Sequence, residues 1–247
     1  LPAAVATAVF EMWNASNMAF SLCPMLSMAA IELLAHAGTP DQKMRYLPKL
    51  VSGEWTGTMN LTEPQAGSDL AAVRTRAEPL PDGTYKIFGT KIFITWGEHD
   101  MAENIVHLVL ARPEGAGPGT KGLSMFMVPK YHFDFETGEL GERNGVYATN
   151  VEKKMGLKAS ATCEMTFGDG TPAVGYLVGS HGLQWLGFNG SAMVFFVFLL
   201  VGSLCNLIVA ERAETKGIRI GFGEYARVGV PVTLLTVLWG TAVLLIA

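Results

Sequence analysis

Charged residues are scarce near the end of this 247-residue chain, and cysteines are scarce throughout it. Between Asp169 and Glu211 there is no Asp, Glu, Lys or Arg. The three cysteines, Cys23, Cys163 and Cys205, are odd in number and far apart. That pattern argues against a disulfide framework and a zinc site, and it fits a reducing compartment. The sequence has no basic patch of the kind that would indicate nucleic-acid binding. No signal peptide is predicted, and the missing initiator Met suggests a truncated N-terminus.

The charge that is present divides the chain into two parts. Residues 1–182 hold 14 Lys and Arg against 19 Asp and Glu, a net of −5, whereas residues 183–247 hold 4 against 3, a net of +1. The first part therefore has the composition of an acidic soluble protein. The second contains two uncharged segments of 20 residues, 191–210 and 228–247. Each is long enough to span a hydrocarbon core of about 30 Å, so a membrane hairpin is predicted. The alternative is a pair of buried soluble helices.

The pattern over residues 3–53 predicts helices. Apolar residues at helical spacing indicate one helix over 3–19 and a second over 26–37, which ends at Gly38. A third helix is expected after Thr39, because Thr39 is a good N-cap and is followed by Pro40 and Gln42 at the capping-box spacing. That helix should end near 52–53 and bury one face, made of Tyr46, Leu47, Leu50 and Val51.

The hydrophobic period changes after residue 53. Alternating β-branched and aromatic residues predict six strands, over 54–61, 85–88, 91–96, 105–111, 123–128 and 163–167. Turns are predicted at 81–83 and at 88–90, and a mobile loop is predicted at 113–121. Short strands at this spacing favour a small antiparallel barrel or sandwich. The fold class is therefore α+β, with the two-helix transmembrane hairpin following the β-domain.

Two segments have the composition of a cofactor site. The first, residues 59–69, offers the hydroxyls of Thr62 and Ser68 on an irregular backbone that contains Pro64 and Gly67. The second, residues 91–97, is a β-branched and aromatic run that carries a further hydroxyl and two large rings. A polar turn after a strand is the alternative interpretation of the first segment. Spacing alone does not show that the two segments meet.

The amino-acid sequences of these segments resemble those of a known family. LTEPQAGSD at 61–69, followed by GTKIFITWG at 89–97, resembles the acyl-CoA dehydrogenases, flavoenzymes that desaturate acyl-CoA thioesters. TPDQKMRYLPKLVSGEWTG at 39–57 resembles the connection between the helical N-terminal domain and the β-domain of that family. GEHDMAENIVHLVLAR, EKKMGLKASATCEM and GYLVG resemble the branch of larger bacterial enzymes related to 3-methylmercaptopropionyl-CoA dehydrogenase. The resemblance covers about residues 1–185.

The resemblance implies a division into domains. Residues 1–53 would be part of a helical N-terminal domain, and residues 54–182 a β-domain that binds flavin and acyl-CoA. Residues 183–190 would form a junction, and residues 191–247 the transmembrane hairpin. In the family the N-terminal helices help to wall the acyl pocket. Met18, Phe20 and Met28 are candidates for that role here, although core packing is the expected alternative.

The resemblance also implies roles for single residues. Thr62 would bond the polar edge of the isoalloxazine ring of FAD, and Ser68 would lie between the flavin diphosphate and the acyl thioester. Phe93 stands where the family usually has Trp stacked on the flavin, and Thr95 would reach the flavin N5. Fixed donors there would stabilise the charge that builds on the ring. The implied cofactor-binding residues are Met59, Leu61, Thr62, Ser68, Phe93, Ile94 and Thr95, with Ser68 also binding substrate.

A complete relative removes an α-proton with a glutamate while hydride passes to FAD, and an electron-transfer flavoprotein then reoxidises the cofactor. That glutamate, the helices of the homo-oligomer core and further flavin contacts belong to a C-terminal domain for which no counterpart is found after residue 185. No catalytic residue is therefore assigned, and little or no turnover is expected. The alternatives are a non-catalytic flavin or acyl-CoA binding module and a fragment of a membrane transporter.

The last quarter carries a different resemblance. GSLCNLIVAERAETKGIRIGFGEYARVGVPVTLLT is similar to the C-terminal end of ion-transporter-superfamily carriers, including arsenite and sodium/proton antiporters. In those carriers a Gly-Ser-x-x-Asn segment, here Gly202, Ser203 and Asn206, breaks a helix near the substrate site. Basic residues between the two hydrophobic segments should lie in the cytoplasm, which places the flavin domain outside, away from CoA and FAD. The hypothesis is a chain that joins two unrelated gene fragments near residues 184–190.

Several isolated residues have both a functional and a structural interpretation. His99, His107 and His132 lack metal-ligand spacing, so surface or packed histidines are expected and no metal site is predicted. The basic cluster of Lys153, Lys154 and Lys158 could contact CoA phosphates, but a solvated cluster is the expectation.

Overall fold

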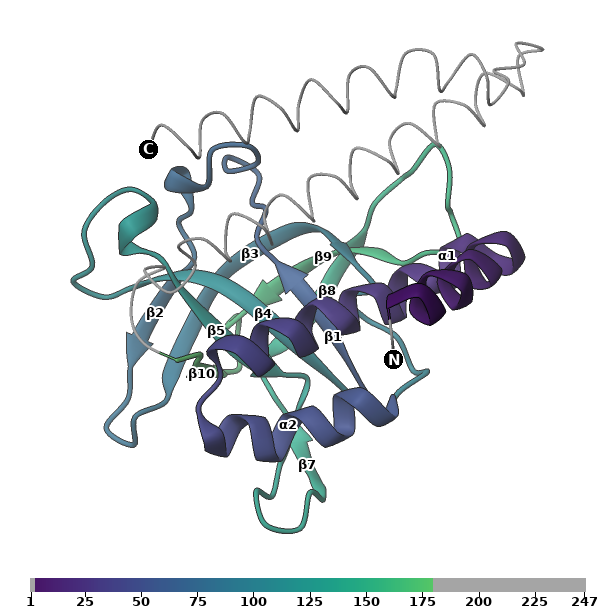
Figure 1. Ribbon diagram of the computed structural model, residues 1–247. Coiled ribbons are helices and arrows are strands. Elements are labelled where there is room, and N and C mark those ends of the chain that lie inside the picture. Colours follow the sequence, from purple (N-terminus) through teal and green to yellow (C-terminus); the bar gives the residue numbers. More distant parts are fainter. Residues whose placement is uncertain (1–2, 180–247) are drawn as a thin grey trace, which may run out of the picture. The chain divides into compact units, whose positions relative to one another are not determined.

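A computed structural model describes residues 3–179 of the chain (Figure 1). The junction predicted at 183–190 and the hairpin predicted at 191–247 lie outside the described residues. The elements, in chain order, are α1 Ala3–Ala37, α2 Pro40–Ser52, β1 Trp55–Asn60, η1 Leu70–Ala72, β2 Arg76–Pro79, β3 Tyr85–Thr95, β4 Asn104–Pro113, η2 Thr120–Gly122, β5 Ser124–Pro129, β6 Tyr131–Phe133, β7 Leu140–Arg143, β8 Val146–Val151, β9 Thr162–Phe167 and β10 Ala173–Leu177.

Helix α1 is two helical segments joined at Asn17. Asn17 has non-helical backbone angles, φ −158° and ψ 87°. Its side-chain oxygen accepts a hydrogen bond of 3.1 Å from the amide of Phe20, which is the bond that an N-cap residue makes. The predicted gap between residues 19 and 26 is therefore wrong, because a new helical segment begins at the Asn17 cap and continues through Pro24 to Ala37.

Helix α2 begins and ends at its predicted residues. Thr39 and Gln42 form the expected capping box, and Gly53 ends the helix in the left-handed conformation with φ 83°. Tyr46 and Leu50 are buried, as predicted. The prediction for Val51 is wrong, because 68% of this residue is exposed and it lies off the packed face.

Five strands close into a ring. β4 pairs with β5, β5 with β10, β10 with β3, and β2 joins β3 back to β4. β1 extends the sheet beyond β4, while β9 and then β8 extend it beyond β3. The predicted barrel-like β-domain is confirmed, but its pairing is not antiparallel throughout, since β1 and β2 both run parallel to β4. The connections from β1 and β2 to β4 are long enough to cross over, as parallel pairing requires.

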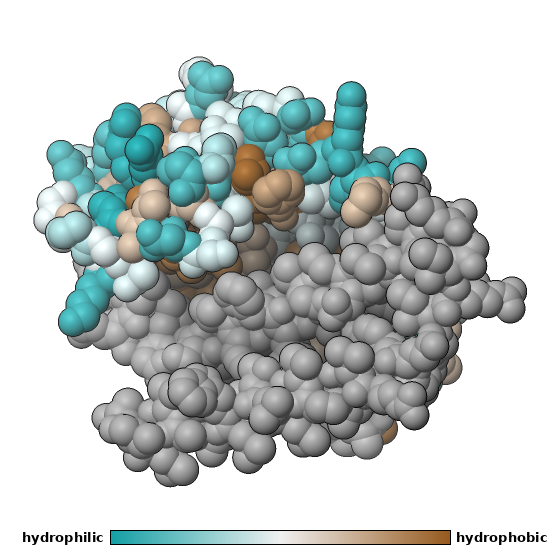
Figure 2. Space-filling model, turned by 90° about the horizontal axis from the view of Figure 1, so that it is seen from above, coloured by the Kyte–Doolittle hydropathy of each residue, from teal (hydrophilic) through white to brown (hydrophobic). Residues whose placement is uncertain are grey.

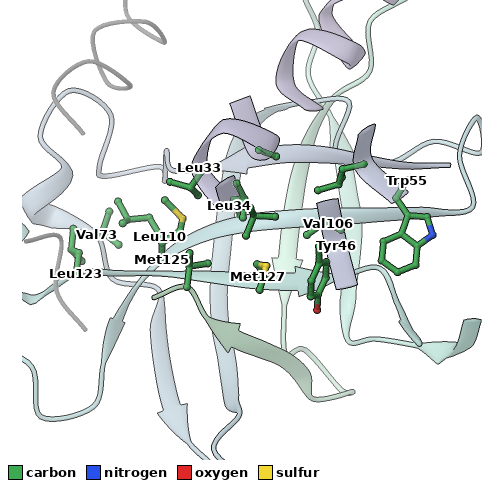
Figure 3. Packing of buried hydrophobic residues seen from close by; sticks show 14 of the residues in the cluster. Leu33, Leu34, Tyr46, Trp55, Val73, Val106, Leu110, Leu123, Met125 and Met127 are labelled. Carbon is green, nitrogen blue, oxygen red and sulfur yellow. The ribbon is translucent and has the colours of Figure 1, made fainter. Parts of the chain in front are cut away.

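The central strands β4 and β5 are buried on both faces. On one face they pack against α1 and α2, and Figure 3 shows Leu34, Tyr46, Val106 and Met127 gathered in this layer. On the other face, alternate residues of the same strands fill the interior of the ring together with side chains from β2, β3, β9 and β10. These interior residues include Ala77, Ile87, Val109, Ala111, Phe126, Val128, Met165 and Ala173. Two covered faces explain why most residues of β4 and β5 are apolar.

Strand β3 differs most from its prediction. It was expected as two strands separated by a turn at residues 88–90, but it is one strand whose first part pairs with β10 and whose last part pairs with β9. Gly89 does not form a turn. It lets β3 approach Thr75 closely, because a Cβ at Gly89 would lie 2.4 Å from Oγ1 of Thr75. The turn at 81–83 is confirmed by the hydrogen bond of 2.8 Å from the amide of Leu80 to the carbonyl of Thr84. Strands β2, β6, β7, β8 and β10 were not predicted.

The described surface is largely hydrophilic on the face that Figure 2 shows, with scattered hydrophobic residues. Phe20 and Met28 of α1 are 41% and 44% exposed, so the expectation that they pack in the core is wrong. Among the described residues, Ala8–Ala37 is the one segment long and apolar enough to cross a membrane by length and composition. Of its most apolar window, 44% is buried within the protein.

Candidate functional site

The two segments singled out by their composition lie side by side in the fold. The loop that follows β1 meets the last part of β3 where the amide of Ile92 donates a hydrogen bond of 2.9 Å to the carbonyl of Thr62. The loop itself is closed by two reciprocal backbone bonds of 3.0 Å between Glu63 and Ala66. Thr62 is therefore placed on β3 from a rigid turn, which is the tertiary contact that spacing alone could not show.

A buried ion pair lies beneath this contact. The side chain of Lys91 is fully buried, and its ammonium lies 2.8 Å from Oε1 of Glu63, which is 3% exposed. The same ammonium donates a hydrogen bond of 3.0 Å to the carbonyl of Leu61. A lysine between apolar strand residues predicts a surface position, so sequence reasoning missed it. Two features of the sequence could have indicated this pair. Glu63 lies in a turn that contains Pro64, and Lys91 interrupts the hydrophobic pattern of a strand.

The Glu63 carboxylate is surrounded by donors. The amides of Arg74 and Thr75 donate to it at 2.8 and 3.0 Å, and the hydroxyl of Thr75 donates at 2.5 Å. Burial alone would raise the pKa of Glu63, but the Lys91 ammonium and these donors outweigh it and lower the pKa to about 2. Burial lowers the pKa of Lys91 to about 8, against the opposing effect of Glu63. Both groups are therefore charged at pH 7.

A β-bulge turns the Phe93 side chain outward. The pairing of β3 with β9 shifts between Lys91 and Ile94, and Phe93 has a left-handed φ of 60°. Phe93 is 58% exposed, whereas Ile94 is 2% exposed and lies in the interior of the ring. A non-glycine residue in this conformation carries strain that the surrounding strands must hold. The result is an exposed aromatic ring on an otherwise ordered strand.

Three hydroxyls of the two segments are free to bind a ligand. Within residues 3–179, the hydroxyls of Thr62, Ser68 and Thr95 make no hydrogen bond to the protein. Thr62 and Thr95 are half-buried and Ser68 is exposed. Thr95 is held opposite Thr162 of β9. The carboxylate of Asp69 is already used, because it caps η1 by accepting a bond of 3.0 Å from the amide of Ala71. Free hydroxyl donors together with an exposed flat ring fit a planar heteroaromatic ligand.

The side chains of the remaining predicted residues pack against or within the apolar clusters. Met59 and Leu61 are half-buried and pack against the apolar layer under the helices. Ile94 points into the ring interior. The structure therefore brings Thr62 and the Phe93–Thr95 strand end together, leaves Ser68 on the outer part of the loop, and turns the side chains of these other three residues away.

Trp96 ties the site strand to α1 and was also missed as a site residue. Its backbone has a left-handed φ of 53°. Its indole Nε1 donates a hydrogen bond of 2.9 Å to the carbonyl of Ala19, and 9% of the residue is exposed. The residue that follows Thr95 thus reaches the helix just after the Asn17 cap. Nothing local in the sequence pairs this tryptophan with that carbonyl.

The histidines are held as structural groups. His107 is buried, its Nδ1 lies 2.8 Å from the hydroxyl of Thr58, and burial lowers its pKa to about 3. His99 bonds Thr56 at 2.9 Å, and burial, helped by Lys130, lowers its pKa. The structure groups no three His, Cys, Asp or Glu side chains as a metal site within the residues it describes.

The basic cluster divides into two kinds of residue. Lys154 is half-buried and donates a hydrogen bond of 2.7 Å to the carbonyl of Leu157, so it closes the loop between β8 and β9. Lys153 and Lys158 are exposed. The expectation of a wholly solvated cluster is therefore wrong for Lys154, because its ammonium serves backbone carbonyls.

Two domain models of one family match the sequence. Residues 2–54 match the family described as acyl-CoA dehydrogenase, N-terminal domain, and residues 58–169 match acyl-CoA dehydrogenase, middle domain. The 3-methylmercaptopropionyl-CoA dehydrogenase of Ruegeria pomeroyi is 52% identical over 188 residues, which are 75% of this chain and 31% of that protein. The broad-specificity linear acyl-CoA dehydrogenase FadE5 of Mycobacterium tuberculosis is 56% identical over 168 residues, which are 67% of this chain and 26% of that protein.

The fold has solved counterparts. The structure of Caenorhabditis elegans ACDH-11 in complex with C11-CoA superposes with a TM-score of 0.52 at 26% identity, over 65% of this chain and 27% of that chain. This chain spans about a third or less of the length of the two curated relatives named above. The matched part is the helical segment and the β-domain. The β-domain holds the two segments that contain Thr62 and Phe93, which together are called the Thr62–Phe93 site.

Proposed function

Because the chain belongs to the acyl-CoA dehydrogenase family through its N-terminal and middle domains, we propose that the Thr62–Phe93 site binds FAD and an acyl-CoA thioester. The observation that carries this is the backbone bond between Thr62 and Ile92, the residue before the exposed Phe93, which joins two segments that carry unused hydroxyls. FAD, when bound, supplies the acceptor for the hydride in an α,β-desaturation. The ACDH-11 structure, which contains C11-CoA, supports the acyl-CoA assignment.

Each residue of the site has a role that its position supports. The Phe93 ring offers a flat apolar face, and the bulge keeps it outside the core. Thr62 and Thr95 offer hydroxyls on two segments that are held together, so they can orient a polar ring edge without rearrangement. Ser68, on the exposed part of the loop, is placed to donate toward a phosphate or a thioester. The half-buried and buried neighbours exclude water from the inner side of the site.

The chain is proposed to hold the binding half of such an enzyme. A family enzyme uses a glutamate base from a C-terminal domain, whereas the two domain models that match this chain are those of the N-terminal and middle domains. Loss of a general base alone costs about 10²- to 10⁴-fold in rate. Turnover of acyl-CoA by the purified chain should therefore be low. In an intact relative an electron-transfer flavoprotein would reoxidise the reduced cofactor.

The experiment is an FAD titration of the purified chain, followed by quenching of flavin fluorescence. We expect saturable binding, and we expect Phe93→Ala to weaken it about tenfold or more, since an aromatic stack contributes on the order of 1.5 kcal/mol. Phe135→Ala is the control, because Phe135 is 39% exposed and belongs to a separate aromatic group with Tyr176. No saturable binding by the unaltered chain would refute the flavin assignment.

A second proposal concerns residues 191–247 and is supported by composition alone. Two uncharged segments of 20 residues favour a membrane hairpin, with the transporter-like motif at Gly202, Ser203 and Asn206 in the first. The topology would put a cytoplasmic flavin domain on the wrong side of the membrane, which favours a join of two gene fragments. Carbonate extraction of membranes tests the hairpin. A chain released entirely into the wash contradicts it.

A further inference from the structure

The Lys91–Glu63 ion pair is an unusual way to stabilise a fold. Lys91 is fully buried and Glu63 nearly so, and the two residues are 28 positions apart in the chain. Removing both charges from water carries a large desolvation penalty, so a packed apolar pair would stabilise the fold as well or better. The use of charge at this position therefore calls for a reason other than stability.

The pair joins the two halves of the site at a defined register. The Lys91 ammonium contacts two groups on the loop, the carboxylate of Glu63 and the carbonyl of Leu61, which flank Thr62 on both sides. The carbonyl of Thr62 itself accepts a hydrogen bond from the amide of Ile92, the residue that follows Lys91. Three consecutive loop residues are thus bonded to two consecutive strand residues. A one-residue slip of β3 would break all three contacts.

The same pair holds the bulge that exposes Phe93. Lys91 points inward to Glu63, and the next side chain of β3 known to point into the ring interior is Ile94. Two residues, Ile92 and Phe93, lie between these inward positions where a regular strand would have one. The extra residue is the bulge, and Phe93 takes its left-handed φ of 60° there. Fixing Lys91 inward therefore fixes where the strain falls and which ring is presented.

The Glu63 end of the pair is fixed independently of Lys91. Two backbone amides, of Arg74 and Thr75, and the Thr75 hydroxyl hold the carboxylate. Thr75 in turn packs against the backbone of Gly89 at the start of the second part of β3. The carboxylate is therefore a rigid anchor, and the lysine is the movable member that is drawn to it.

We propose that Lys91 and Glu63 are positioning residues, a buried latch that sets the Thr62 loop and the Phe93 bulge in the geometry that receives the flavin. This inference rests on the proposed function for the identity of the ligand, but the latch itself is a property of the chain alone. Neither residue needs to touch the ligand. Their effect is carried by Thr62 and Phe93.

The test removes both charges without leaving either one unpaired. In Lys91→Met/Glu63→Gln, the methionine keeps most of the buried stem and the glutamine oxygen can still accept from the amide and hydroxyl of Thr75, while the bond from the amide of Arg74 is lost. Hydrogen–deuterium exchange of the ligand-free chain is measured over residues 61–66 and 91–95 and over β4 and β5. We expect exchange in the two site segments to rise about tenfold or more while β4 and β5 change less than about twofold. A purely structural role would raise exchange everywhere or nowhere.

The matched control is the exposed ion pair between Lys49 and Glu54, whose side chains are 34% and 45% exposed. Lys49→Met/Glu54→Gln removes one pair of the same charges far from the site and should leave exchange in 61–66 and 91–95 unchanged. Lys91→Arg is the conservative variant, which keeps the charge and should retain part of the protection. If the double variant at the latch keeps the protection of the unaltered chain in both segments, the proposal is overturned.

FAD titration of the same proteins separates this proposal from the proposed function. If the unaltered chain binds FAD, the latch variant should bind it about tenfold more weakly or worse, while the Lys49→Met/Glu54→Gln control binds normally. FAD affinity equal to that of the unaltered chain would overturn the positioning role. If the unaltered chain does not bind FAD, the flavin assignment fails, and the exchange experiment still decides whether the latch orders the loop and the bulge.

Discussion

The indole Nε1 of Trp96 donates a hydrogen bond of 2.9 Å to the carbonyl oxygen of Ala19, across 77 residues of sequence. Ala19 follows the break at Asn17, where the second segment of α1 begins. Trp96 follows Thr95, the last residue of β3. A single side chain therefore connects the end of the site strand to the start of a helical segment.

Trp96→Phe removes this hydrogen bond and keeps an aromatic side chain. We expect the free energy of unfolding to fall by about 1–2 kcal/mol, from the lost bond and the smaller ring. Urea titration measures the change. Trp13→Phe on α1, where 38% of the residue is exposed, is the control and should change stability by less than about 0.5 kcal/mol. Equal effects of the two substitutions would show that ring size, and not the bond, decides.

Gly57 lies where α1 approaches β1 closely. A Cβ on Gly57 would lie 2.4 Å from the Cβ of Ala30. Gly57→Ala should therefore push the helix from β1 and lower the free energy of unfolding by about 1–3 kcal/mol. Gly117→Ala is the matched control, since a Cβ there meets nothing within 4 Å and its φ is not left-handed. Thermal unfolding of both variants gives the comparison, and a neutral Gly57→Ala would contradict the packing.

Phe93 separates stability from ligand binding. Its left-handed φ of 60° suits glycine better than any residue with a Cβ. Phe93→Gly should therefore be more stable than Phe93→Ala by about 1 kcal/mol, even though glycine is the more flexible residue in the unfolded chain. Chemical denaturation of the pair measures this difference. Alanine equal to or more stable than glycine would show that the bulge is not strained at this residue.

Acid should weaken the latch in a defined pH range. The pKa of Glu63 is about 2 in the fold against an ordinary 4.5, so its stabilising effect is complete above pH 4.5 and is lost as the pH falls from there through 2. Lys91, whose pKa is about 8, stays charged throughout this range. The loss in the free energy of unfolding is on the order of 3 kcal/mol.

Unfolding by urea at several pH values between 5 and 2 measures that loss. The variant Lys91→Met/Glu63→Gln should show a shallower fall in stability with acid than the unaltered chain. Glu114→Gln, which changes an exposed carboxylate on the loop after β4, is the control and should follow the unaltered chain. Parallel curves for all three proteins would show that Glu63 does not couple to folding.

The sequence alone determined the features whose causes are local. The capping box of Thr39 and Gln42 and the end of α2 at Gly53 follow from residues a few positions apart. Strands β4 and β5 were predictable because their apolar runs are long and bounded by turn residues. The resemblance carried by residues 61–69 and 89–97 indicated the family, which the matches at 2–54 and 58–169 confirm. Those segments also named Thr62, Phe93 and Thr95 as candidates.

Only the tertiary structure decided how these pieces meet. The turn expected at residues 88–90 is absent because Gly89 is needed for a close approach to Thr75, 14 residues away in sequence. The pairing of Lys91 with Glu63 and of Trp96 with Ala19 joins residues 28 and 77 positions apart. Periodicity and capping report on neighbours within one or two turns of chain, whereas burial of a charge is settled by which distant group comes to neutralise it. From the sequence, a lysine in a strand is predicted to be exposed unless the carboxylate that pairs with it is known.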